Sequence, residues 1–318
     1  MIEFHSTALG ICPHPLDSFE FDLAADALKK DTRSEVQAPL SVKREAFDNT
    51  RDARFFFPSK EHAEALARCA FMVDDGNMGV GLLSGEIGCG KTLVRTVLQR
   101  KLSKERFLVL SLENCLFEFD DLLLEILSQI RGERLYPHDL PDRYSRIAAF
   151  KDCLVQRVAR SSRHLLIVLD EAQQLDLRSL EALKGLTNIT PERRNLFSLL
   201  LVGQPEIHAR IRRLPQFEQR VGLRYHLNHL SLEDTAAYLR HRLTVAGLSG
   251  PQPFTDSAVD AVFEYSHGIP REINRIAKLA LDHAIAHQMA RIDHNLVSTV
   301  GEDLGGHDEI RLPLVSGL

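Results

Sequence analysis

The sequence predicts an α/β fold, a parallel sheet flanked by helices, followed by a small all-helical domain. Short apolar runs alternate with segments of helical periodicity, as in repeated strand–helix units. The runs are "GVGLLS", "RFLVLSL", "HLLIVLD", "LFSLLLVG" and "VGLRYHL". Most are apolar at consecutive positions, which is expected for strands that helices cover on both faces.

The α/β domain is expected at residues 55–229, after an N-terminal arm at 1–54 that we expect to be partly ordered. The arm contains Pro13, Pro15 and Pro39 and shows no sustained periodicity. Ser59 is placed to cap the first helix of the domain. Further helices are expected from Lys91, across 119–131 and 141–160, over "SLEALKGL" and near Ile207.

The strand signal stops after His229, and residues 230–300 are expected to form the helical domain. Ser231 and Asp234 fit a capping box, and Thr255 can cap the next helix. Pro270 suits the first position of a long helix that reaches about Met289. Residues 301–318 are expected to be a loose C-terminal tail.

Composition narrows the class of protein. With 44% hydrophobic residues, the 318-residue chain has ample material for a core, so disorder throughout is excluded. A net charge of −5 argues against a surface built throughout to coat nucleic acid, although a local basic face stays open. The five cysteines are odd in number and never spaced as C-x-x-C, which favours reduced thiols over disulfides or a zinc site.

The stretch "GEIGCGKT" behind the first strand has the form G-x-x-x-x-G-K-[ST] of a phosphate-binding loop. Its glycines allow successive backbone N–H groups to turn toward phosphate, and the helix that follows adds its positive dipole end. Lys91 is predicted to reach the outer phosphates, and Thr92 to offer its hydroxyl to Mg²⁺. The predicted nucleotide-binding residues are Gly85, Glu86, Ile87, Gly88, Cys89, Gly90, Lys91, Thr92 and Leu93.

The run "LLIVLDEA" is the second half of the predicted site. A buried strand that ends in two carboxylates delivers them to the edge of the sheet where the phosphate loop also lies. Asp170 would hold the magnesium through its water shell, and Glu171 would polarise the attacking water as general base. The fourteen histidines show no H-E-x-x-H or similar spacing, so no metal other than nucleotide-bound Mg²⁺ is expected.

These motifs resemble Walker A and Walker B of AAA+ ATPases, and more narrowly those of the general secretion pathway protein A (ExeA/GspA) family. The resemblance covers about residues 46–290 and rests on further phrases: "DNTRDARFFFPSKEHAEALAR", "LLLVGQPEI", "QRVGLRYHLNHLSLEDTAAYLRHRL" and "YSHGIPREINRIAKLAL". It implies ATP and Mg²⁺ as ligands, ATP hydrolysis, and a helical lid domain. It also implies that Gln204 acts as the sensor 1 residue and Arg271 as the sensor 2 arginine.

Elementary chemistry supports both sensor assignments. Gln204 is a polar residue directly after an apolar strand, which indicates a hydrogen-bonding need at the strand's end, although a simple "GQPE" turn is the alternative. Arg271 falls in the first turn of a helix, where the dipole disfavours cations unless an anion faces them. The alternative for Arg271 is an arginine that points to solvent.

Arg220 and Arg224 flank "VGL" in the region where related ATPases place an arginine finger for the neighbouring subunit. We favour Arg220, because Arg224 lies within the strand and could pair with an adjacent carboxylate; a purely structural role for both remains the alternative. A finger acting between subunits would make hydrolysis depend on assembly.

The resemblance implies an ATP-dependent homo-oligomer that assists a secretion or type IV pilus-like machine through a membrane-associated partner. The alternative is a DNA-bound transposition helper or target-selection ATPase, which ATPases of this clade also resemble. The longest apolar runs are far shorter than the roughly 20 residues of a spanning helix, and the N-terminus lacks a signal-peptide pattern. We therefore expect a cytoplasmic protein without a membrane span, attached to the inner membrane, if at all, through a partner.

Overall fold

The computed structural model describes residues 44–113, 115–189, 195–248 and 250–305. The expected N-terminal arm lies outside these residues up to position 43, and the expected tail lies outside them from position 306.

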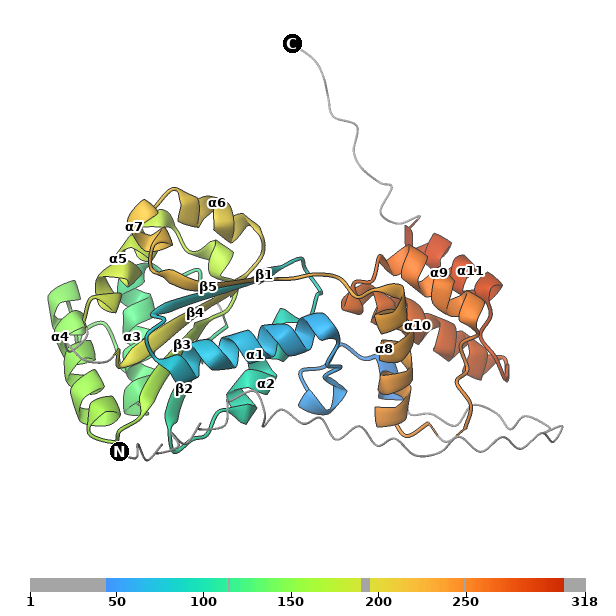
Figure 1. Ribbon diagram of the computed structural model, residues 1–318, viewed down its shortest axis with the longest axis horizontal. Helices are drawn as coiled ribbons and strands as arrows, with labels where there is room; N and C mark the ends of the chain where they lie inside the picture. The colour runs from blue at the N-terminus through green and yellow to red at the C-terminus, as the bar shows by residue number, and fades with distance from the viewer. Residues whose placement is uncertain (1–43, 114, 190–194, 249, 306–318) are drawn as a thin grey trace, which may run out of the picture. The chain divides into compact units, whose positions relative to one another are not determined.

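A five-stranded parallel sheet forms the centre of the α/β domain, with strand order β2-β3-β4-β1-β5 (Figure 1). Its strands are β1 (Val80–Gly85), β2 (Phe107–Leu112), β3 (His164–Leu169), β4 (Phe197–Gly203) and β5 (Val221–Leu227). The predicted parallel sheet is confirmed. β1, β3 and β4 are buried along their whole length, whereas the edge strands β2 and β5 have partly or fully exposed positions.

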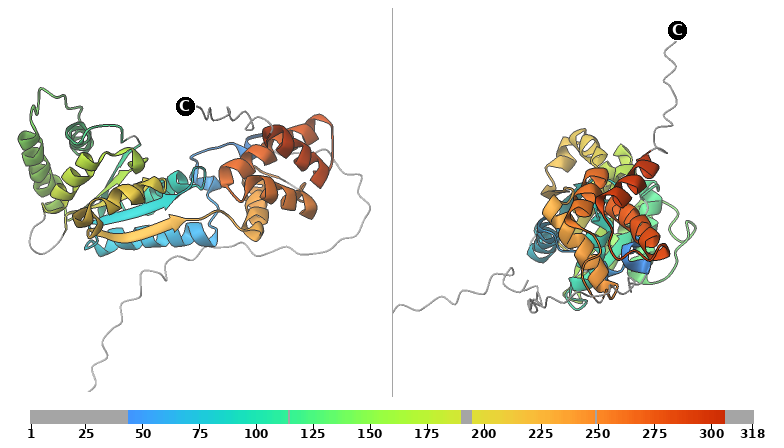
Figure 2. Two further views of the ribbon diagram at one scale, coloured as in Figure 1. Left: turned by 90° about the horizontal axis from the view of Figure 1, so that it is seen from above. Right: turned by 90° about the vertical axis from the view of Figure 1, so that its right-hand side faces the viewer.

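Helices cover both faces of the sheet (Figure 2). Neighbouring side chains of a strand point to opposite faces, and accordingly Leu82 and Leu83 belong to different core clusters. The Leu83 cluster joins the sheet to α1 (Lys60–Asp75) and α2 (Lys91–Lys101). The Leu82 cluster joins it to α3 (Phe119–Arg131), α4 (Arg143–Cys153), α5 (Leu177–Thr187), α6 (Glu206–Arg212) and α7 (Pro215–Glu218).

The helix expected over 141–160 has two parts. Asp142 caps α4 through the backbone N–H of Ser145, and the Ser145 hydroxyl completes a capping box. From Leu154 to Ala159 the helix continues with the wider π-helical turn. The extent of this segment was predicted correctly, but its change of pitch was not.

The helical domain contains α8 (Leu232–Val245), α9 (Asp256–Ser266), α10 (Pro270–Ala286) and α11 (His294–Gly305). Their apolar faces share one core that includes Leu239, Val262 and Ile276. The predicted all-helical region is confirmed. α10 ends at Ala286, before the expected Met289, and α11 was not predicted as a helix and runs past residue 300.

The caps of this domain follow the sequence. Ser231 accepts a hydrogen bond from the Asp234 N–H, and Thr255 accepts one from the Ala258 N–H. A capping box would also need a hydrogen bond from the Ser231 backbone N–H to the Asp234 side chain. Among the described residues that bond is not formed, so only half of the predicted box occurs. Asp293, at the start of α11, accepts from the backbone N–H of Leu296 and stops the first turn from fraying.

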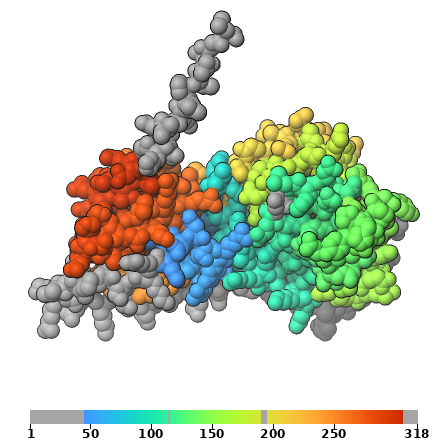
Figure 3. Space-filling view, turned by 180° about the vertical axis from the view of Figure 1, so that it is seen from behind, coloured from blue at the N-terminus to red at the C-terminus, as the bar shows by residue number. Residues whose placement is uncertain are grey.

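We call residues 45–56 the strap. On the face shown in Figure 3, blue residues at the N-terminal end of the described chain lie between the α/β domain and the helical domain. The strap includes most of one 3₁₀ turn (Arg44–Phe47) and all of another (Ala53–Phe55). Phe47 is buried in the core of the helical domain, and Phe56 is buried in the core that covers β1 and α1. The part of the expected arm closest to the α/β domain is therefore packed structure.

Candidate functional site

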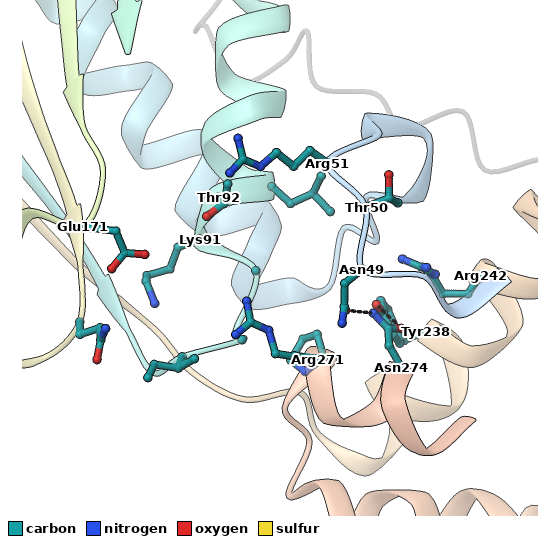
Figure 4. Close-up of a pocket in the computed structure, with 16 residues that line it drawn as sticks. Asn49, Thr50, Arg51, Lys91, Thr92, Glu171, Tyr238, Arg242, Arg271 and Asn274 are labelled. Atoms are coloured by element: carbon teal, nitrogen blue, oxygen red, sulfur yellow. Dashed lines mark hydrogen bonds between the residues drawn. The ribbon is translucent and has the colours of Figure 1, made fainter. Parts of the chain in front are cut away.

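A cavity of about 380 Å³ lies where the carboxyl ends of the strands, the strap and the helical domain meet (Figure 4). Many of the residues predicted from the sequence line it. From the phosphate loop these are Ile87, Gly88, Gly90, Lys91, Thr92 and Leu93. Glu171, Gln204 and Arg271 line the same cavity, although they come from β3, β4 and α10. Lys91 and Glu171 are therefore close enough to meet one ligand.

Some predicted residues are not part of the cavity wall. Gly85 is buried and Glu86 is exposed, neither lines the cavity, and their carbonyl oxygens accept hydrogen bonds from Lys91. Cys89 is buried and turned away, and Asp170 is only 5% exposed. Arg220 is exposed on the surface instead of in the cavity.

Two glycines of the loop are required by its geometry. Gly88 and Gly90 have φ angles of +86° and +97°, in the left-handed region that favours glycine. A Cβ atom at Gly88 would lie 2.7 Å from Cβ of Arg271, and one at Gly90 would lie 2.8 Å from Nε2 of His62. The loop is thus packed against α1 on one side and α10 on the other.

Lys91 is a buried cation that lies over the loop. Its Nζ donates hydrogen bonds to the carbonyl oxygens of Gly85 and Glu86, each at 2.7 Å. Burial lowers the pKa of Lys91, and the negative charges of Glu171 and Asp170 oppose that shift. The amine is held at the cavity wall, where an anion can attract it away from the two carbonyls.

Asp170 is held on both oxygens. Oδ1 accepts from the backbone N–H of Glu171 at 3.0 Å, and Oδ2 lies 3.5 Å from Nε of Arg95. Burial raises the pKa of Asp170, and the positive charge of Arg95 opposes that rise. Arg95 also pairs with Glu113 at 3.2 Å, and Glu113 accepts from Arg51 of the strap at 2.5 Å. A chain of charges therefore joins the strap to Asp170; Arg95 and Arg51 were not predicted from the sequence.

Glu171 follows β3 in the left-handed conformation, with φ +53°. Its carboxylate accepts a hydrogen bond from Nε2 of Gln173 at 2.6 Å. The other end of the same amide, Oε1, accepts from the backbone N–H of Gln204 at 3.0 Å. Gln173 thereby links the carboxylate at the end of β3 to the end of β4.

The three predicted arginines have different surroundings. Arg271 lies in the first turn of α10, as predicted, and its backbone N–H donates to the Gly88 carbonyl at 3.3 Å. Arg220 donates to Oδ1 of Asn188 at 2.5 Å. Arg224 pairs with Glu218 at 3.3 Å, which is the kind of carboxylate pairing that was anticipated for it.

The wall opposite the phosphate loop was missed by sequence reasoning. It consists of Asn49, Thr50, Arg51, Tyr238, Arg242 and Asn274. The Tyr238 hydroxyl donates to Oδ1 of Asn274 at 2.9 Å, and Nδ2 of Asn274 donates to Oδ1 of Asn49 at 3.0 Å. The available signal was a set of polar residues on the apolar faces of predicted helices, where burial demands hydrogen-bond partners.

Together, the parallel sheet, the glycine loop at the start of α2 and the carboxylates after β3 define a P-loop protein of the AAA+ family. A family model described as an AAA domain matches residues 74–211. More narrowly, the chain is an ExeA/GspA-like AAA+ protein: it is 35% identical to general secretion pathway protein A of Aeromonas hydrophila over 263 residues, which is 82% of this chain and 47% of that protein. The chain spans about half the length of the curated relatives it matches.

Solved structures support the fold. The Aeropyrum pernix ORC2 protein, solved as ADPNP-ADP complexes, has a TM-score of 0.60 at 20% identity, covering 82% of this chain and 71% of its own. Drosophila ORC bound to DNA also has a TM-score of 0.60, at 17% identity, covering 87% of this chain and 70% of its own. Among the described residues, no helix is both long and apolar enough to cross a membrane.

Proposed function

We propose that this protein binds and hydrolyses ATP and couples its nucleotide state to oligomer assembly. One observation carries the proposal: the phosphate loop, Glu171 and Arg271 face a single cavity although they come from three elements and two domains. ATP bound there would contact both domains at once. A ligand that contacts two domains biases their relative position, which is how nucleotide state can control assembly.

The residues present fit MgATP. The backbone amides at the start of α2 have no partner within the helix, and the helix dipole favours an anion beside them. The acceptors of the Lys91 ammonium group are two neutral carbonyls, which a phosphate can replace. Thr92 lines the cavity and Asp170 is buried directly after β3, so a hydroxyl and a carboxylate oxygen, ligands that Mg²⁺ accepts, come from the start of α2 and the end of β3.

Each side chain has a separate task in the proposed reaction. Lys91 leaves the carbonyls of Gly85 and Glu86 and binds the outer phosphates, where its charge stabilises the transition state. Magnesium, when bound, neutralises charge between the phosphates. Glu171 orients and polarises the attacking water, with its carboxylate positioned by Gln173, and Arg271 contributes positive charge from the helical domain.

Hydrolysis by the purified protein, measured at increasing protein concentration, tests this function. We expect Mg²⁺-dependent release of phosphate, and we expect Glu171→Gln to retain ATP binding, lose turnover and trap an ATP-bound assembly. No ATP binding by the wild type would reject the proposal. ATP binding without hydrolysis would reduce it to a nucleotide-gated scaffold.

The same assay tests the arginine finger. Arg220 is exposed and held by a neutral amide, whereas Arg224 is paired with a carboxylate on its own chain. If Arg220 completes the site of a neighbouring subunit, specific activity rises with protein concentration, and Arg220→Ala loses on the order of 10³-fold in rate. Arg224→Ala is the matched control and keeps most of the activity. Activity strictly proportional to concentration would contradict a finger in trans.

The similarity to general secretion pathway protein A favours a secretion or pilus-like machine as the destination of the ATPase. We therefore propose that it acts in the cytoplasm, in contact with the inner membrane through a partner protein. The reported similarity covers 47% of that protein, so the partner has to be identified by binding assays with candidate membrane proteins.

DNA is the second candidate partner, and a specific observation favours it. Drosophila ORC, which shares this fold, was solved bound to DNA. Arg212 at the end of α6, Arg213 after it and Arg220 before β5 are exposed, so the segment between α6 and β5 carries three exposed arginines. Stimulation of ATPase activity by duplex DNA, with an affinity that falls steeply with salt, would favour this destination over secretion.

A further inference from the structure

His62 connects the first helix to the phosphate loop. It lies in the first turn of α1 and is only 5% exposed. Its Nδ1 lies 2.7 Å from the hydroxyl of Ser59, and its Nε2 lies 2.9 Å from the carbonyl oxygen of Cys89. A histidine at 62 was not among the residues that the sequence indicated, because nothing in its spacing relates it to the loop 27 residues later.

The partners of the ring fix its tautomer. A carbonyl oxygen can only accept, so Nε2 must carry the proton that is donated to Cys89. Burial lowers the pKa of His62; the hydrogen bond to Cys89 and the charges of Asp234 and Glu61 oppose this only in part, so the neutral ring is favoured. Nδ1 of a neutral ring with a protonated Nε2 is an acceptor, and the Ser59 hydroxyl therefore donates to it. The same hydroxyl oxygen accepts the His62 backbone N–H at 3.3 Å.

This hydrogen bond orients one peptide group of the loop. In a trans peptide the C=O and N–H bonds point in opposite directions. Because the Cys89 carbonyl points to His62, the N–H of Gly90 points the other way, toward the side where Gly90 lines the cavity. Among the described residues, the Gly90 amide donates to no backbone carbonyl, so it is available to a ligand.

We propose that His62 is a positioning residue of the phosphate site: by holding the Cys89 carbonyl, it aims the Gly90 amide at the phosphates. This inference rests on the proposed nucleotide function. The close packing of His62 against Gly90 supports it, since a Cβ at Gly90 would lie 2.8 Å from Nε2. His62 does not touch the phosphates itself, so its effect appears as a loss of binding and not as a loss of a catalytic group.

Two variants separate the effect of the hydrogen bond from the effect of side-chain volume. His62→Gln can keep an N–H donor near the position of Nε2, whereas His62→Leu fills similar space without a donor. We expect His62→Leu to bind MgATP about three- to tenfold more weakly, the range that corresponds to one net hydrogen bond. We expect His62→Gln to stay within about twofold of the wild type. Affinity is measured by calorimetry, beside thermal unfolding of each variant without nucleotide.

His164→Leu is the matched control. His164 is also buried and hydrogen-bonded, with Nε2 2.9 Å from the Ser198 hydroxyl. It is the first residue of β3 and therefore lies at the amino ends of the strands, away from the phosphate loop. We expect this change to lower stability without weakening MgATP. The inference is overturned if His62→Leu binds like the wild type, if His62→Gln is as weak as His62→Leu, or if the His164 control loses affinity equally.

A second measurement needs no variant and no nucleotide. ¹⁵N NMR of histidine-labelled protein reports which ring nitrogen carries the proton. We expect His62 in the Nε2–H form, with a slowly exchanging proton; the Nδ1–H form would overturn the inference. This result does not depend on ATP. Failure of the proposed role of His62 can therefore be told apart from failure of the proposed ATPase function.

Discussion

The two walls of the cavity are built differently. The wall formed by the phosphate loop is a short contiguous stretch, in which backbone amides and Lys91 do the binding. The opposite wall combines residues 49–51 of the strap with Tyr238, Arg242 and Asn274 of the helical domain. The first wall depends on local backbone conformation, and the second exists only when the strap and the helical domain are packed together. The second wall is therefore the one that can report domain arrangement.

The largest expected effect concerns the first wall. Lys91→Met removes the only cation of the loop, and we expect hydrolysis to fall on the order of 10³-fold with strongly weakened MgATP binding. The free energy of unfolding should fall by about 1–3 kcal/mol, the cost of leaving the carbonyls of Gly85 and Glu86 without their donor. Phosphate release and nucleotide titration are the measurements. Lys104→Met, an exposed lysine after α2, is the control and should behave like the wild type.

The second expected effect concerns the second wall and is one of stability. Arg242 is 2% exposed, donates to the carbonyls of Ala46 and Asp48 at 2.6 Å each, and lies 4.4 Å from the ring centroid of Phe55. Arg242→Met leaves two carbonyls without their donor and should cost about 2–3 kcal/mol in the free energy of unfolding. Urea denaturation measures this cost. Arg240→Met, two residues earlier in α8 and exposed, should cost nothing measurable.

The contrast explains what the sequence could and could not predict. The glycine loop, the paired carboxylates and the buried strands could be predicted because each is a contiguous sequence pattern with one backbone geometry. The role of Arg271 could also be predicted, because the helix dipole disfavours a cation in the first turn unless an anion faces it. Those of Asn49, Asn274 and Arg242 could not, because each looks ordinary in its own segment. Only the fold shows that Arg242 spans almost two hundred positions to hold the strap at Ala46.

The third expected effect separates nucleotide binding by the second wall from the chemistry at Lys91 and Glu171. Asn274 and Asn49 form a hydrogen-bonded pair on the second wall, away from Lys91 and Glu171 (Figure 4). Asn274→Ala should weaken MgATP about fivefold and leave kcat close to that of the wild type, because the lost contact stabilises ground and transition states equally. Steady-state kinetics measure both constants, with the exposed Asn295→Ala as control. A large fall in kcat would show that this wall takes part in the chemistry.

The smallest predicted effect is a pH dependence of the free energy of unfolding, caused by the titration of His62. Burial lowers the folded-state pKa of His62 below its ordinary value of 6.5, so below about pH 6.5 the unfolded chain binds more protons than the folded one. Stability should therefore rise with pH up to about 6.5 and then level off, with His62 contributing at most about 1.4 kcal/mol per pH unit.

Asp170 has the opposite sign, because its raised folded-state pKa makes the folded chain bind more protons above its ordinary value of 3.8. This contribution and those of other histidines are shared by the wild type and His62→Gln, so the difference between the two proteins isolates His62. Urea titrations at pH 5.5, 6.5 and 7.5 should show a shallower slope for His62→Gln below pH 6.5 and parallel behaviour above it. Equal slopes would mean that the folded chain protonates His62 as readily as the unfolded chain, and burial of a neutral Nε2–H ring could then no longer explain how the loop is held.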